Sequence, residues 1–86
     1  MTKEVKNAFL KKIELQAEIN RMQHSDDRRP LQDWTMIAAT HMGHLFEAVM
    51  KNDQAEIEKE ILQIAAPLLE LYQELTTKND NENVWK

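Results

Sequence analysis

The stretch HLFEAVMKNDQAEIEKE, residues 44–60, decides the fold of this chain. It begins inside one amphipathic helix pattern and ends inside another, and only the polar triplet at 51–53 separates the two. Asp53 followed by Glu56 has the spacing of a capping box, which marks the start of a helix. A connection this short makes the two helices antiparallel neighbours. The stretch therefore predicts a helical hairpin.

Hydrophobic periodicity extends this hairpin in both directions and adds a helix before it. We expect helices over about residues 3–23, 30–51 and 54–77, followed by a flexible tail over 78–86. The connections are short, so sequential helices, including the first and the second, are expected to be antiparallel neighbours. Pro30 suits the first turn of the second helix, whereas Pro67 should kink the third helix or split it in two.

The composition is that of a single all-α domain. The 86 residues include one Gly and two Pro and are rich in residues that favour helices. The glycine, Gly43, lies inside the second helix, where it costs about 1 kcal/mol relative to alanine. A close approach by a neighbouring helix would explain this residue, and so would chance.

Self-association is expected because a chain this short buries only a modest core. The apolar residues of the first helix spread over more than half of its circumference, so we expect this helix to contact more than one partner. The protein itself is the expected partner, as a dimer or tetramer. The alternative is that some apolar residues of this helix are simply exposed.

Several classes of protein are disfavoured. There is no cysteine, which excludes disulfides and thiolate chemistry. The formal net charge of −4 argues against nucleic-acid binding, which needs a basic surface. No apolar run is long enough to span a bilayer, and the first residues do not resemble a signal peptide. We expect a soluble, cytoplasmic protein that binds neither membrane nor nucleic acid.

Two histidines, His41 and His44, stand three residues apart in the second helix. At 100° per residue they lie about 60° apart, facing the same neighbour. A tight metal site usually has three or four protein ligands, so further donors must come from elsewhere. Glu60, with Gln63 one turn later, lies at the edge of the third helix that faces this seam. The alternatives are histidines that form hydrogen bonds in the seam without a metal, and a solvent-exposed Glu60.

The sequence around these residues resembles the MazG-like all-α nucleoside triphosphate pyrophosphohydrolases over about residues 28–77. That family has a tryptophan, then an apolar helix reading E-E-x-G-E-L-x-E-A, then a short polar connection and E-x-x-D-x-L. This chain has Trp34, then THMGHLFEAV, then the polar connection and EILQIAAPLLEL. The resemblance implies an oligomeric helical protein in which four acidic residues of the two motifs hold magnesium against nucleotide phosphates.

The chain departs from the family at the metal ligands. His41 and His44 stand at the first acidic pair, and Glu60 and Gln63 stand at the second. The resemblance implies these four as the metal ligands, but imidazoles favour Mn, Ni or Zn over Mg. The departures fit either an altered metal site or a retained fold without catalysis, so no catalytic residue is assigned.

The resemblance also implies a nucleoside triphosphate as the ligand. Trp34 would form a wall of its site, and four basic side chains near the helix ends would contact phosphates: Arg28, Arg29, Lys51 and Lys78. The alternative is a non-catalytic helical module that binds a protein, like accessory proteins of phages and other mobile elements. The histidines would then be structural, and their protonation would weaken the oligomer below about pH 6.

Overall fold

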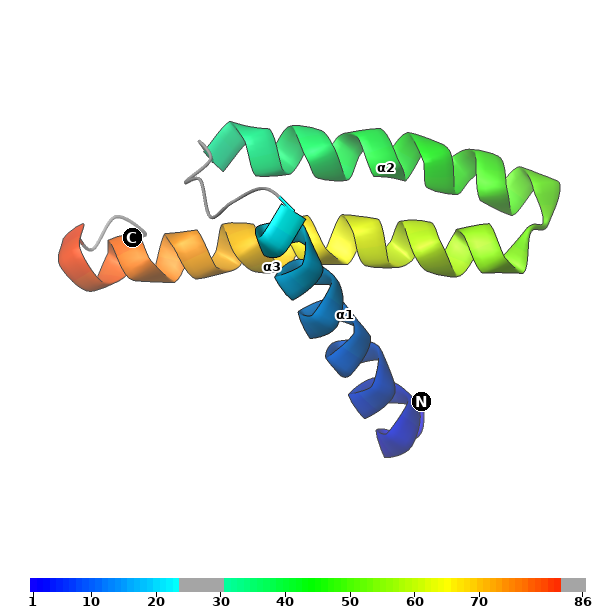
Figure 1. The fold of residues 1–86 in the computed structure, drawn as a ribbon, viewed down its shortest axis with the longest axis horizontal. Helices are drawn as coiled ribbons and strands as arrows, with labels where there is room; N and C mark the ends of the chain where they lie inside the picture. Colours follow the sequence, from blue (N-terminus) through cyan, green and yellow to red (C-terminus); the bar gives the residue numbers. More distant parts are fainter. Residues whose placement is uncertain (24–30, 83–86) are drawn as a thin grey trace.

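Helix α3 is the element on which the other two helices pack. The computed structural model describes residues 1–23 and 31–82, with side chains through residue 76. It contains α1 (Lys3–Gln23), α2 (Leu31–Lys51) and α3 (Gln54–Glu82). Helices α2 and α3 run antiparallel, and α1 crosses α3 at a steep angle (Figure 1). The expected all-α fold of three helices in one compact bundle is confirmed.

The turn of the hairpin satisfies the backbone at both helix ends. Asn52 adopts φ 57°, and its N–H donates to the carbonyl of Val49 at 3.0 Å. The N–H of Asp53 donates to the carbonyl of Ala48 at 3.1 Å. This pair of bonds is a Schellman motif, which closes α2. Asp53 then caps α3, because its Oδ1 accepts from the N–H of Glu56 at 3.2 Å.

The Asp53–Glu56 pair therefore forms only one half of the expected capping box, the bond from the Glu56 N–H to the Asp53 side chain. In a full box the side chain at the position of Glu56 would bond to the Asp53 N–H. That N–H is already bound by the end of α2. A connection of only two residues makes the same backbone groups serve both helices.

The left-handed backbone at Asn52 can be tested by substitution. Asn52→Val should lower the free energy of unfolding by about 1–2 kcal/mol, because a β-branched residue is strained there. Asn52→Gly should change it by less than about 1 kcal/mol, because glycine adopts this conformation freely. Urea unfolding of the two variants measures the difference, and equal stabilities would contradict the assigned turn.

Helix α3 runs through Pro67 without interruption, so of the two expected alternatives, a kink or a division into two helices, the division is wrong. Pro67 is fully buried beside Ala66, and it lines a hollow together with Asn20 of α1 and Trp34 of α2. The helix stays continuous at this buried residue although proline removes one of its hydrogen bonds. The kink itself stays a prediction.

The end of α3 lies further along the chain than expected. The helix continues to Glu82 instead of ending at about residue 77, so part of the expected tail is helical. The last four residues, 83–86, lie outside the described residues, and the flexible tail stays a prediction. No helix in the described part of the chain is long and apolar enough to cross a membrane.

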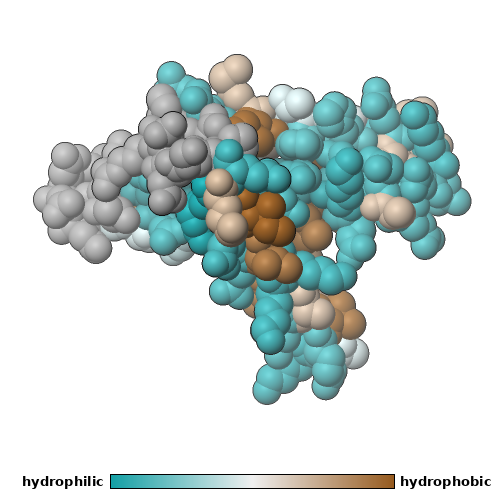
Figure 2. Space-filling model, in the orientation of Figure 1, coloured by the Kyte–Doolittle hydropathy of each residue, from teal (hydrophilic) through white to brown (hydrophobic). Residues whose placement is uncertain are grey.

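The core is small and consists mainly of alanine. Apart from Trp34, the buried apolar residues are Ala17, Ala38, Ala48, Ala66 and Pro67. Many larger apolar side chains remain exposed, and those of α1 are visible along its length in Figure 2. The described residues thus agree with the expectation that one copy buries only a modest core.

The position of α1 differs from the expectation that successive helices are antiparallel neighbours. Within the described residues α1 packs on α3 and not on α2. Ala17 is buried at this crossing, where its small side chain permits close approach. The side chains of Arg21 and Glu70 form an ion pair beside it, and Lys12 pairs with Glu58 at 2.6 Å on the surface. The first half of α1 is exposed and projects from the bundle.

The Arg21–Glu70 pair should contribute more to stability than the exposed pair. Glu70 is only 7% exposed, so removal of Arg21 leaves a buried carboxylate without its cation. We expect Arg21→Met to lower the free energy of unfolding by about 2 kcal/mol. The control Lys12→Met should lower it by less than about 1 kcal/mol, because both partners face solvent. Denaturant unfolding of both variants provides the comparison, and equal losses would contradict this ranking.

Candidate metal centre

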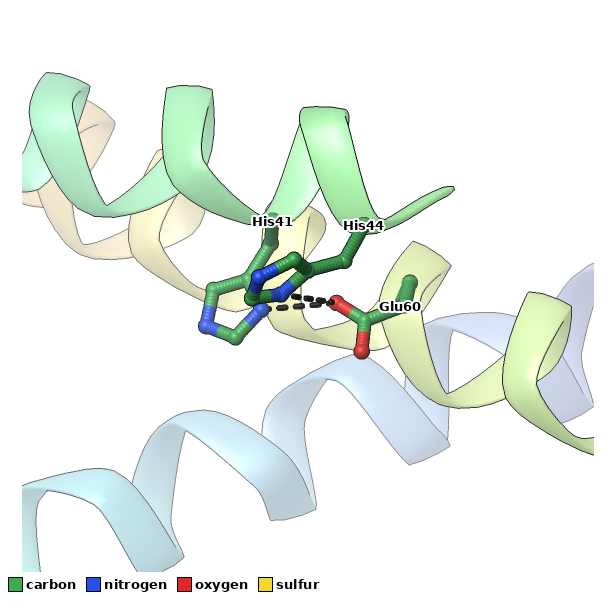
Figure 3. A group of neighbouring side chains, drawn as sticks. All are labelled: His41, His44 and Glu60. Carbon is green, nitrogen blue, oxygen red and sulfur yellow. Dashed lines mark hydrogen bonds and ion pairs between the residues drawn. The ribbon is translucent and has the colours of Figure 1, made fainter. Parts of the chain in front are cut away.

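The inner face of α2 places the histidines against α3. Trp34, Ala38 and Ala48 are buried on this face. His41 follows Trp34 by two helical turns, so it also points inward and is half-buried. His44 lies at the edge of the same face and is more exposed. The antiparallel register then brings Glu60 of α3 opposite both histidines, as Figure 3 shows.

The three side chains converge on one carboxylate oxygen. The Nδ1 atom of His41 lies 2.7 Å from Oε1 of Glu60, which is a hydrogen bond. The Nδ1 atom of His44 lies 3.7 Å from the same oxygen. The two imidazole rings meet edge to face, with centroids 5.5 Å apart and an interplanar angle of 81°. The expected meeting of His41, His44 and Glu60 is confirmed.

These distances suit the ligands of a divalent transition ion. Each residue offers a ligand atom, and the three atoms lie within 4.8 Å of one another. Two ligands bound at about 2.1 Å with tetrahedral geometry are separated by about 3.4 Å. The observed separations of 2.7 and 3.7 Å lie on either side of that value. Small side-chain rotations would therefore place all three atoms around one ion.

Glu60 is the buried member of the group. Only 4% of this residue is exposed, whereas His44 faces solvent. An ionised carboxylate at such a position needs a cation or strong donors. The Nδ1–H of a neutral His41 can donate to it, or a metal ion can replace that proton. His44 at the exposed edge provides a side from which an ion can enter.

Gln63 lines a hollow with His41 but is not one of the three converging residues. It lines a hollow of about 410 Å³ together with Trp34, His41 and Pro67. The residue stands one helical turn beyond Glu60, toward the start of α2. Its role as a fourth ligand stays a prediction, and so does the role of Trp34 as a wall.

A second hollow, of about 390 Å³, opens on the other side of His44, toward the hairpin turn. Lys51 and Lys59 line it together with Glu60. The remaining polar residues of its lining are Glu47, Asp53 and Glu56. Four carboxylates thus face two ammonium groups, and phosphate groups would need a bound cation to enter. We call this space the turn hollow.

The expected basic residues are only partly placed by the structure. Lys51 lines the turn hollow, whereas Trp34 lines the other one, so the two do not share a hollow. Arg28 and Arg29 lie outside the described residues, and the Lys78 side chain lies outside the described side chains. The sequence interpretation missed Lys59. The sequence contained a signal for it, because Lys59 directly precedes Glu60 and lies across the turn from Lys51.

Comparison of the chain with protein-family models, with curated protein sequences and with solved structures finds no match in any of the three. The resemblance to the MazG-like family therefore stays a prediction.

Proposed function

We propose that this protein is a MazG-like helical protein that binds a divalent transition metal and, through it, the phosphates of a nucleotide. The metal ligands are His41, His44 and Glu60. The observation that carries the proposal is their convergence across the α2–α3 seam, at the positions where the family has acidic ligands. Nickel, zinc or manganese is favoured over magnesium, because two of the three donors are imidazoles.

The donor set also leaves room for a substrate. Two histidines and one glutamate are the protein ligands of several catalytic zinc sites, in which the remaining position is open. An ion held here would supply Lewis acidity toward phosphate oxygens. Lys51 and Lys59 would add positive charge on the side of the turn hollow.

The reaction that follows from this proposal is hydrolysis of a nucleoside triphosphate. The oxygen of a water molecule bonds to the α-phosphorus while the bond to the bridging oxygen of the β-phosphate breaks. The products are a nucleoside monophosphate and pyrophosphate, and the proton of the water passes to solvent or to a carboxylate of the turn hollow. Glu47 is exposed there and is the carboxylate nearest to His44 in sequence.

Release of pyrophosphate tests this proposal directly. The substrates are ribo- and deoxyribonucleoside triphosphates, supplied with magnesium, manganese, nickel or zinc in turn. We expect turnover with the softer ions and none in the variant His41→Ala/His44→Ala. Turnover with magnesium alone, or undiminished turnover in the variant, would overturn the proposed metal site.

A second candidate function is that of a non-catalytic helical module that binds a protein. The exposed apolar side chains of α1 favour it, among them Val5, Leu15 and Met22. Absence of turnover with every metal, in a folded protein, would support this candidate. A constant light-scattering mass between pH 8 and pH 5 would count against a histidine-dependent assembly.

A further inference from the structure

The outer face of α2 carries an apolar stripe that no other part of the described structure covers. Its members recur at intervals of three and four residues, as in a helix that packs on another helix. We define the α2 stripe as Met36, Ala39, Gly43, Phe46 and Met50. All five residues are exposed, with Phe46 at 65% and Met50 at 86%.

The stripe points away from the bundle. At 100° per residue, Gly43 lies opposite the face that buries Trp34, Ala38 and Ala48 against α3. Nothing in the described residues lies over this face, so a second molecule is the partner that would bury it. Exposed apolar patches of this kind, bordered by polar residues, are typical of interaction sites.

Gly43 has no role that the described part of a single chain explains. A Cβ atom added at this residue would meet nothing within 4 Å. A neighbouring helix that would explain this glycine is therefore absent from the described part of the chain. Glycine still weakens the helix relative to alanine. A backbone that packs closely against Gly43 from another molecule would give the residue a function.

We propose that two copies of this chain associate through their α2 stripes, antiparallel, about a two-fold axis at Gly43. This axis pairs each residue with the one equally far on the other side of Gly43. Met36 then lies opposite Met50 of the partner, seven residues from Gly43 in each case. Phe46, three residues after Gly43, lies next to Ala39 of the partner, four residues before Gly43 on the same side of the stripe, so a large side chain meets a small one.

Charges at the ends of the stripe select the antiparallel arrangement. Asp33 and Lys51 are 18 residues apart, about five turns, so they lie along the same flank of α2. In the antiparallel pair, Asp33 of each copy lies beside Lys51 of the other. In a parallel pair the two copies of this flank would lie on opposite sides of the contact, so Asp33 and Lys51 of different copies would not meet. The opposite flank carries exposed Met42 and Val49, which extend the apolar contact.

This assembly does not require the proposed metal site, because none of His41, His44 and Glu60 belongs to the α2 stripe. It differs from an assembly through the first helix, which the sequence alone indicated. The contact adds apolar burial to a chain whose own core is mostly alanine. Helix α2 would then be covered on both of its faces.

Single cysteines test the symmetry, because the chain contains none of its own. Gly43→Cys should form a disulfide-linked dimer under mild oxidation, since two copies of this position meet at the axis. Met36→Cys alone should not, because its copies lie about 21 Å apart along an antiparallel pair. A mixture of Met36→Cys with Met50→Cys should give the linked heterodimer.

Two outcomes of this experiment would overturn the proposal. One is the absence of a linked Gly43→Cys dimer. The other is linkage of Met36→Cys alone as readily as Gly43→Cys, which indicates a parallel or non-specific contact.

Light scattering with substituted α2 provides a second, independent measurement. Gly43→Leu should halve the mass of the assembly while its circular dichroism stays helical, because the added side chain meets open space in one copy. Asp33→Lys should also weaken the assembly, and Asp33→Lys/Lys51→Asp should restore it. An unchanged mass in Gly43→Leu, or a wild-type chain that stays monomeric over a concentration series, would overturn the proposal.

Discussion

Replacement of His41 and His44 together by alanine should lower the affinity for nickel or zinc by more than about 100-fold. Loss of an outer hydrogen-bond partner alone reduces metal affinity about 10- to 100-fold, and this variant removes two of three direct ligands. Titration calorimetry measures the change. The same metals should raise the midpoint of thermal unfolding of the wild type, because the site exists only in the folded chain.

The binding should also depend on pH. A metal ion must displace the imidazole protons, so affinity should fall as the pH is lowered from 8 to 5. Glu58→Gln is a matched control for Glu60→Gln, because Glu58 is on the same helix but exposed and paired with Lys12. Glu60→Gln should weaken binding strongly and Glu58→Gln should not. Equal metal affinities of the wild type and the double histidine variant would contradict the proposed metal site.

Replacing the two histidines and Gln63 by carboxylates should reverse the metal preference. In the variant His41→Glu/His44→Glu/Gln63→Asp, the ligands match the acidic pattern of the MazG-like family. Magnesium prefers oxygen ligands and nickel prefers imidazole, so we expect magnesium binding to appear and nickel affinity to fall at least about tenfold. Calorimetry with both metals checks the reversal.

The same variant should be less stable than the wild type without metal. Its new carboxylates lie close to buried Glu60, and like charges at this distance repel. Magnesium should then recover the lost stability. The control Gln54→Glu/Ala55→Glu adds charge at exposed residues of α3, so its stability should not respond to magnesium. An equal magnesium response of variant and control would show that the added charge, and not the site, is responsible.

The hairpin could be predicted in detail because its signals are local. The triplet at 51–53 and the cap at Asp53 set the helix ends, and a connection this short leaves one register. The periodicity of α2 then placed His41 and His44 on the inner side. Since Glu60 follows the turn at a fixed distance, the candidate site followed from the same signals.

The position of α1 and the continuity of α3 could not be predicted from local sequence patterns. Two ion pairs hold α1 on α3, one from Lys12 to Glu58 and one from Arg21 to Glu70. The partners are separated by 46 and by 49 positions in the sequence, and no local pattern encodes such a pairing. The sequence interpretation therefore placed α1 beside α2, although α1 packs on α3. The continuity of α3 at Pro67 likewise depends on its burial between helices, which the isolated helix pattern does not show.

The sequence by itself determined the helix class, the hairpin and the residues that meet across it, because helical periodicity and a two-residue connection constrain one another. Only the tertiary structure decided where α1 lies, that Glu60 is buried while His44 is exposed, and that Gly43 faces open space. Those properties depend on which surfaces of segments distant in the sequence pack against each other and are buried from water. That choice is made by the whole packed chain and not by any one segment.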